Sequence, residues 1–120
     1  MRLSEDLRRR TKRYASSIIR FYVKLPKERE EVRVLGSQLL RSGTSVAAHA
    51  REVSRARSDS EFCSKLDSLL QEADESQLWL ELLQDDCGVK GELLEQLLAE
   101  TDELMAIFTT MVSKLRKSGA

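Results

Sequence analysis

The sequence predicts an all-α protein, an antiparallel up-down-up-down four-helix bundle. The 120 residues include one proline and five glycines, too few for a sandwich or barrel that turns every ~10 residues. Apolar residues recur at steps of three and four in four long segments, as expected of helices. The connections between these segments are short, so successive helices should run antiparallel. A chain of this length can bury one core, and residues 1–120 are therefore expected to form a single domain.

The first two predicted helices are separated by the only proline. Apolar residues share one face over residues 7–25, and Pro26 ends that helix. The second helix carries a heptad seam over residues 32–53 that includes His49. Its middle is rich in small residues, and Gly43 costs a helix about 1 kcal/mol relative to alanine. We therefore expect a neighbouring helix to approach closely at Gly43.

The last two predicted helices have recognisable ends. Ser58 and Glu61 form the pattern of a capping box at the start of the third helix. That helix should run to about Asp86, before two glycines break it. The fourth carries its apolar face over residues 94–115 and ends in cations, which the helix dipole favours.

The net charge is zero, but it is unevenly distributed along the chain. Residues 1–58 carry 15 Lys and Arg against 6 acids, whereas residues 59–112 carry 2 against 14. Such asymmetry points to an anionic partner for the basic half. The alternative is that the two halves neutralise each other within the fold.

Basic residues on the outer faces of the first two helices are the candidate nucleic-acid-binding residues. On the first helix, opposite the apolar face, they are Arg9, Arg13, Arg20 and Lys24. On the second helix they are Arg33, Arg41, Arg51 and Arg55. Arginine suits bidentate phosphate contacts, and no aromatic residue lies among them for base stacking. We therefore expect contact with the phosphate backbone of RNA or DNA without sequence preference; a solvated basic face is the alternative.

Leu78, Trp79 and Leu82 project away from the apolar face of the third helix. One intramolecular seam cannot bury both faces of a helix, and an apolar patch on the back of a helix favours a subunit contact. We therefore predict a homo-oligomer with these residues in its interface. The alternative is that the fourth helix or a tilt covers them within one subunit.

No catalytic, cofactor-binding or metal-binding residues are predicted. His49 is the only histidine and has Val46, not glutamate, three positions before it, so a ferritin-like metal site is not expected. Glu72, Asp74 and Glu75 form a carboxylate cluster without a nucleophile or second base. They are interpreted as a solvated acidic face or as partners for arginines of the basic half.

Cys63 and Cys87 are predicted to be free thiols. On one continuous helix their separation of 24 residues corresponds to about 36 Å, far beyond what a disulfide spans. The sequence also lacks ~18 consecutive apolar residues and an apolar secretory run. No membrane association is expected, and the predicted location is the cytoplasm.

Three segments together resemble a known protein family. The runs DLRRRTKRYASSIIRFYVKLP, VLGSQLLRSGTSVAAHAREVSRARS and EFCSKLDSLLQEADESQLWLELL resemble bacterial proteins encoded in intervening sequences of 23S ribosomal RNA genes. The resemblance implies a homopentameric ring of four-helix subunits without known catalysis. A related branch provides a nucleic-acid-binding accessory subunit of diversity-generating retroelements. Residues 47–50 read Ala-Ala-His-Ala where family members typically read Gly-Ala-Asn-Tyr.

Two functions are therefore expected in order of preference. The first is a non-enzymatic, homo-oligomeric accessory protein that binds nucleic acid through the basic face of the first two helices. The second is a structural scaffold for protein–protein interaction. In it, the acidic third helix of the next subunit neutralises the basic face of the first helix.

Overall fold

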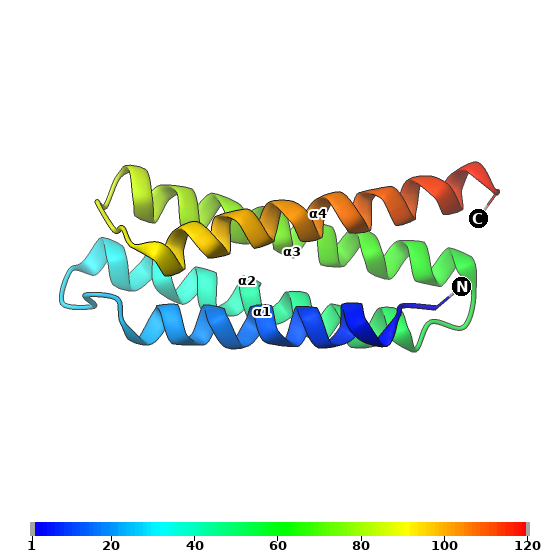
Figure 1. The fold of residues 1–120 in the computed structure, drawn as a ribbon, viewed down its shortest axis with the longest axis horizontal. Helices are drawn as coiled ribbons and strands as arrows, with labels where there is room; N and C mark the ends of the chain where they lie inside the picture. Colours follow the sequence, from blue (N-terminus) through cyan, green and yellow to red (C-terminus); the bar gives the residue numbers. More distant parts are fainter. Residues whose placement is uncertain (1, 120) are drawn as a thin grey trace.

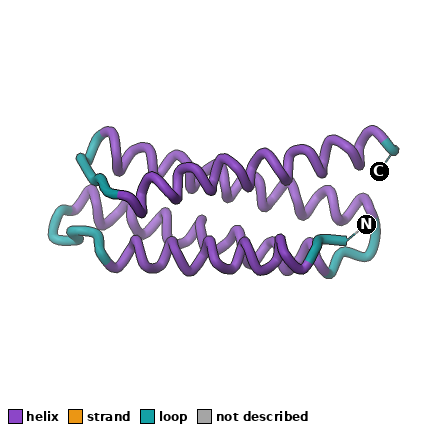
Figure 2. The backbone as a smooth tube through the Cα atoms, viewed as in Figure 1, coloured by secondary structure: helices purple, strands orange, loops and turns teal. Residues whose placement is uncertain are grey.

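The structure, a computed structural model, describes residues 2–119 and contains four helices and no strand in this part of the chain. They are α1 (Glu5–Val23), α2 (Glu30–Ser54), α3 (Asp59–Asp85) and α4 (Glu92–Lys117). Figure 1 shows them side by side in an elongated bundle of 48 × 21 × 20 Å. Short loops join them at alternating ends (Figure 2). The predicted all-α, antiparallel four-helix arrangement is confirmed.

The order of the helices around the bundle follows the order along the chain. α1 contacts α2, α2 contacts α3, and α3 contacts α4, while α4 returns to lie beside α1 through the narrowest of the four contacts. α1 and α3 therefore face each other across one diagonal, and α2 and α4 across the other. The two ends of the described chain lie at the same end of the bundle (Figure 1).

The structure confirms Ser58 as the N-cap of α3, which is one half of the predicted capping box, whereas the Glu61 carboxylate lies 3.7 Å from Arg57. The Ser58 side chain accepts a hydrogen bond from the Glu61 backbone N–H at 3.0 Å, which satisfies one unpaired donor of the first turn. Gly88 follows α3 with φ +70°, and Gly91 precedes α4 with φ +134°. Both conformations disfavour a residue with a Cβ atom, so these glycines set the turn between α3 and α4.

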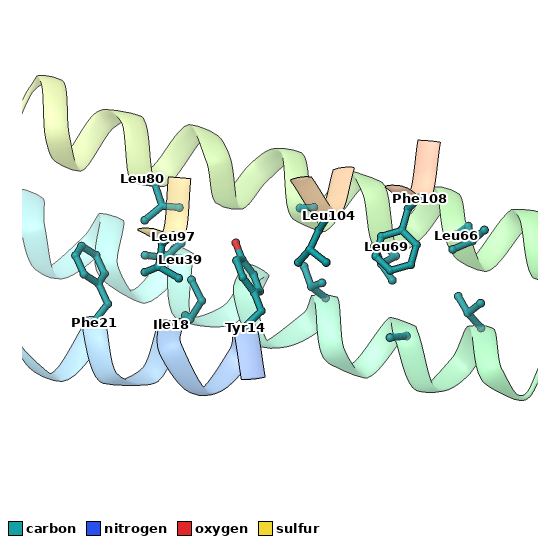
Figure 3. Packing of buried hydrophobic residues seen from close by; sticks show 14 of the residues in the cluster. Tyr14, Ile18, Phe21, Leu39, Leu66, Leu69, Leu80, Leu97, Leu104 and Phe108 are labelled. Carbon is teal, nitrogen blue, oxygen red and sulfur yellow. The ribbon is translucent and has the colours of Figure 1, made fainter. Parts of the chain in front are cut away.

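The core runs the length of the bundle, with one apolar face from every helix (Figure 3). Gly43 lies in it as predicted, because a Cβ atom added there would come within 2.7 Å of Cγ1 of Ile18 on α1. The small residue therefore allows α1 and α2 to approach closely.

The placement of His49 on the buried seam of α2 is wrong. Ala50 is buried at 1% exposure, whereas the His49 side chain is 28% exposed. The reason is that buried positions continue from Val46 by four residues and then three, to Ala50 and Val53. A helix of 3.6 residues per turn drifts against a strict heptad, and His49 lies at the edge of the buried face.

A buried polar layer crosses the middle of the bundle, with one residue from each helix. Tyr14 of α1 bonds Thr101 of α4 at 2.7 Å between their hydroxyl oxygens, and Ser42 of α2 bonds Ser76 of α3 at 2.7 Å. All four residues are 2% exposed or less. Figure 3 shows the Tyr14 hydroxyl pointing from α1 into the centre of the bundle.

The geometry of the layer assigns each hydroxyl proton to a partner. The Thr101 hydroxyl donates to the Leu97 carbonyl at 2.6 Å, and the Ser76 hydroxyl donates to the Glu72 carbonyl at 2.9 Å. Each hydroxyl has one proton, so Tyr14 donates to Thr101. The Ser42 oxygen is 2.7 Å from that of Ser76 and 3.4 Å from the Leu39 carbonyl, so its proton goes to the nearer Ser76 oxygen. Every hydroxyl of the layer therefore has a partner, as buried polar groups require.

Arg10 links α1 to α4, the two neighbouring helices that share the smallest contact in the bundle. Its guanidinium donates two 2.7 Å hydrogen bonds to the Glu100 carboxylate and lies 2.9 Å from Glu103. The Arg10 side chain is 25% exposed and that of Glu100 30% exposed. Hydrogen bonds to these carboxylates hold the pKa of Arg10 above its usual value.

We expect Arg10→Gln to lower the free energy of unfolding by about 1–2 kcal/mol, because it leaves two neighbouring carboxylates without a cation. The matched control is Arg9→Gln, which removes the neighbouring arginine and only a solvent-exposed pair with Glu5. Such pairs contribute less than ~0.5 kcal/mol. Urea unfolding measures both; equal losses for the two variants would contradict the role of Arg10.

Candidate nucleic-acid interface

A basic groove lies between α1 and α2, near the start of α1 and the end of α2. It has a volume of about 640 Å³. We call it the α1–α2 groove. Its cationic lining residues are Arg8, Arg9, Lys12, Arg51 and Arg55.

The local sequence explains why cations surround a hollow. Arg8 and Lys12 are one turn apart on α1 and share a face of that helix. Arg51 lies in the last turn of α2, and Arg55 is the C-cap residue four positions later. The antiparallel arrangement brings the start of α1 beside the end of α2. Between the charged pairs the groove is lined by short side chains of α2, which leave room for a ligand. They are Ala47, Ala48, Ala50 and Ser54.

The groove carries an excess of positive charge. Glu5 is its single acid, and it accepts a 2.7 Å hydrogen bond from Arg9. The remaining four cations form no ion pair with any residue in the described part of the chain. A concave surface with one sign of charge concentrates oppositely charged ligands, so the α1–α2 groove is suited to an anion.

The other three residues predicted on α1 are exposed but border different hollows. Arg13 and Arg20 line a groove between α1 and α4 that also contains Glu100. Arg20 donates to the Ser17 hydroxyl at 2.8 Å. Lys24 lies at the far end of the bundle, beside the loop between α3 and α4.

The four arginines predicted on α2 divide into two kinds. Arg51 and Arg55 line the α1–α2 groove. Arg33 lies 3.4 Å from Glu30 of the preceding turn. Arg41 faces α3 instead of α1, and it lies 3.3 Å from Glu72 and 3.1 Å from Glu75. The interpretation of these carboxylates as partners for arginines of the basic half is confirmed for Arg41.

Arg8 and Lys12 are groove residues that the sequence did not predict. At 100° per residue they project from the opposite side of α1 to Arg13, Arg20 and Lys24, so they fall outside the predicted basic face. The sequence feature that could have identified them is their spacing of four residues, which Arg51 and Arg55 share. Only the packing of α1 on α2 shows that the two pairs face each other.

The predicted interface residues of α3 have different environments. Leu78 is exposed at 46%, and Leu82 is partly exposed. Trp79 packs against the core, and its buried Nε1 has no hydrogen-bond partner in the described part of the chain. Leu78 and Leu82 are therefore available for a subunit contact, whereas the Trp79 ring is partly engaged within the subunit.

The remaining candidate groups have ordinary environments. Nδ1 of His49 lies 2.7 Å from Glu52, and this hydrogen bond lowers the pKa of the Glu52 carboxyl. Cys63 and Cys87 are buried free thiols, as predicted. Among residues 2–119 no group of three His, Cys, Asp or Glu side chains could hold a metal ion, and no helix there is long and apolar enough to span a bilayer.

Comparison with known proteins decides the family. The family model described as 23S rRNA-intervening sequence protein matches residues 5–110, nearly the whole bundle. The chain belongs to this family. The resemblance inferred from the sequence is confirmed.

A solved structure agrees with the assignment of this chain to the 23S rRNA-intervening sequence proteins. It is a protein of unknown function from the S23 ribosomal protein family of Bacteroides thetaiotaomicron, solved at 1.70 Å resolution. It is 30% identical with a TM-score of 0.78, and the match covers 88% of this chain and 96% of the other. No curated protein gives a significant match.

Proposed function

We propose that this 23S rRNA-intervening sequence protein is a non-enzymatic accessory protein that binds the phosphate backbone of RNA or DNA in its α1–α2 groove. One observation carries the proposal. Five cations from two helices line one groove, and its single acid is already paired.

The geometry of the groove supports backbone contacts over base contacts. Residues one turn apart on a helix are separated by about 6 Å along its axis, so each helix offers two cations in a row to successive phosphates. The groove contains no aromatic side chain on which a base could stack. Binding should therefore depend on charge and not on sequence.

The second candidate function is a protein–protein scaffold without a nucleic-acid ligand. The ion pairs of Arg41 with Glu72 and Glu75 favour it, because they show that part of the basic half is neutralised by α3. The unpaired cations of the α1–α2 groove favour nucleic acid. Salt dependence distinguishes the two functions, because neutralised phosphates release counterions and give a steep negative slope of log K against log salt.

We expect Arg51→Gln/Arg55→Gln to weaken binding to unrelated RNA and DNA oligomers by at least tenfold at low salt. The slope should fall by about two per engaged subunit, because each arginine is expected to neutralise one phosphate. Fluorescence anisotropy titrations at several salt concentrations measure both quantities. Failure of the wild type to bind any oligomer at low salt would favour the scaffold.

The matched control is Arg33→Gln/Arg41→Gln, which removes the same charge from the same helix. Because both arginines already lie beside carboxylates, their loss should change binding much less. Equal effects of the two double variants would show that net charge alone attracts nucleic acid, and would contradict a site in the groove.

We also propose that the protein acts as a homo-oligomer that uses Leu78 and Leu82. The family resemblance suggests five subunits. A mass of 13.7 kDa at micromolar concentration by light scattering, that of one chain, would contradict this assembly.

A further inference from the structure

A second groove lies on the other side of α1, between α1 and α4, and the proposed function does not use it. Its volume is about 470 Å³. We call it the α1–α4 groove. From α4 it is lined by uncharged residues and by one acid, Glu100. Its polar lining residues on α1 are Arg13, Ser16, Ser17 and Arg20.

The two arginines of the α1–α4 groove are not neutralised within the fold. Neither Arg13 nor Arg20 forms an ion pair with any residue in the described part of the chain. Glu100 accepts two 2.7 Å hydrogen bonds from Arg10, so its charge is already paired. The groove therefore has an excess of positive charge, which favours an anionic ligand.

The spacing of the two arginines suits an elongated ligand. They are seven residues apart, almost two full turns, and so project from the same side of α1. A rise of 1.5 Å per residue separates their Cα atoms by about 10 Å. Ser16 and Ser17 lie between them, so the groove offers a cation at each end and hydroxyls in the middle.

The hydroxyls of Ser16 and Ser17 are available to a ligand. A serine inside a helix can donate to the carbonyl four residues before it, as Ser45 and Ser54 do at 2.8 and 2.9 Å. Ser16 forms no side-chain hydrogen bond with any residue in 2–119, and Ser17 only accepts one, at 2.8 Å from Arg20. Because each hydroxyl carries one proton, both protons remain free for an acceptor.

We infer that the α1–α4 groove binds a chain of phosphate groups, with Arg13 and Arg20 at its two ends and the hydroxyls of Ser16 and Ser17 on the oxygens between them. Arginine contacts phosphate oxygens through two parallel hydrogen bonds. A chain of phosphates distributes its charge along the groove, whereas a single phosphate places it at one point. The phosphates of a nucleoside triphosphate or of a nucleic-acid strand supply this chemistry.

A ligand in this groove would also tie α1 to α4. Gln96 lines the groove from α4, and its amide nitrogen donates to Glu92 at 3.2 Å with one of its two N–H groups. The second N–H can donate to a ligand held by α1. These two helices share the smallest contact of the neighbouring pairs. Because a ligand that binds only the folded state stabilises it, a phosphate chain should raise the midpoint of thermal unfolding.

Phosphate binding between α1 and α4 does not depend on the proposed function, and it can fail separately. The test is made in the full chain carrying Arg51→Gln/Arg55→Gln, which weakens the α1–α2 groove. The probe is inorganic tripolyphosphate at low salt, measured by isothermal titration calorimetry. Orthophosphate should bind at least tenfold more weakly, and equal affinities for the two anions would contradict a site for a phosphate chain.

Adding Arg13→Gln/Arg20→Gln to this background should weaken tripolyphosphate binding by at least tenfold. Both side chains are exposed, so helical content by circular dichroism should be unchanged. The matched control adds Arg33→Gln/Arg41→Gln, which removes the same charge outside the α1–α4 groove and should change the affinity less than threefold.

The decisive variant is Ser16→Ala/Ser17→Ala, because it removes both hydroxyls and keeps every charge. Alanine is the better helix former, so weaker binding could not result from a loss of folding. We expect affinity for tripolyphosphate to fall at least fivefold, together with a smaller rise in the unfolding midpoint. Attraction by net charge alone would leave both quantities unchanged.

Adenosine triphosphate and a single-stranded oligonucleotide then identify the source of the phosphates. The ligand that occupies the α1–α4 groove should lose affinity when Ser16 and Ser17 are replaced by alanine. Three results would overturn the inference: no binding of tripolyphosphate, serine variants that bind it like their background, or equal effects of the two arginine pairs.

Discussion

Gly43→Ala should lower the free energy of unfolding by about 1–2 kcal/mol, although alanine is the better helix former. The added Cβ atom would lie 2.7 and 2.9 Å from Cγ1 and Cγ2 of Ile18. These atoms are attached to the branched Cβ of a fully buried side chain with restricted rotamers, so they cannot move aside without shifting α1. Overpacking of this kind costs about 1–3 kcal/mol, which exceeds the gain of about 1 kcal/mol in helix propensity.

Gly36→Ala on the same helix is the matched control. Its added Cβ atom would meet Cδ1 of Leu25 at 2.8 Å, the far end of a flexible side chain in the loop after α1. Leu25 can change rotamer, so stability should be unchanged or rise by a few tenths of a kcal/mol. Urea unfolding of the two variants measures the difference; Gly43→Ala at or above wild-type stability would contradict the close contact of α1 and α2.

The wild-type protein should lose about 2–3 kcal/mol of stability between pH 10 and pH 12 through Tyr14. Burial raises the pKa of Tyr14 to about 12, although hydrogen bonds with Thr101 and Ser76 partly offset it. The ordinary value of 10.0 applies to the unfolded chain. Between these two values the unfolded state releases a proton that the folded state retains, so stability falls as pH rises. Below pH 10 both states are protonated and the contribution is fully present.

Tyr14→Phe should remove this alkaline loss. At neutral pH it should cost about 1 kcal/mol, because Thr101 loses the hydrogen bond that Tyr14 donates. The variant should therefore be less stable than the wild type at pH 7 and approach or exceed it near pH 12. Tyr22→Phe is the control, since Tyr22 is the other tyrosine and lies half-buried at the edge of the core. Parallel stability curves for wild type and Tyr14→Phe would show that Tyr14 is not buried in the folded state.

The elements of this fold could be predicted because each depends on residues that are close in sequence. The capping pattern of Ser58 with Glu61, and the glycines after α3, act within one or two turns of the chain. Apolar periodicity similarly reports a buried face without reference to its partner. Gly43 was predicted to be a site of close approach because glycine inside a helix is costly, although its contact with Ile18 was not predicted.

The polar layer was only partly visible in the sequence. Tyr14 and Ser42 fall on the apolar seams, but nothing local pairs Tyr14 with Thr101 on a helix 87 positions away. Ser76 interrupts the apolar seam of α3, and only Ser42 on the facing helix explains why a hydroxyl is tolerated there. The partners in a buried hydrogen bond depend on which residues of neighbouring helices lie at the same level along the bundle, and this is decided by tertiary packing.

The sequence by itself determined the number of helices, their approximate ends, their buried faces except at His49, and the family. The tertiary structure decided which charged residues act together. In the folded chain Arg41 lies beside acids of α3. Arg8 and Lys12 line the same groove as Arg51 and Arg55. The side chains of Ile19 and Val23 remain exposed. The physical reason is that surface side chains obey no burial periodicity. Their neighbours follow from the order and rotation of the packed helices, which contacts between distant residues of the core determine.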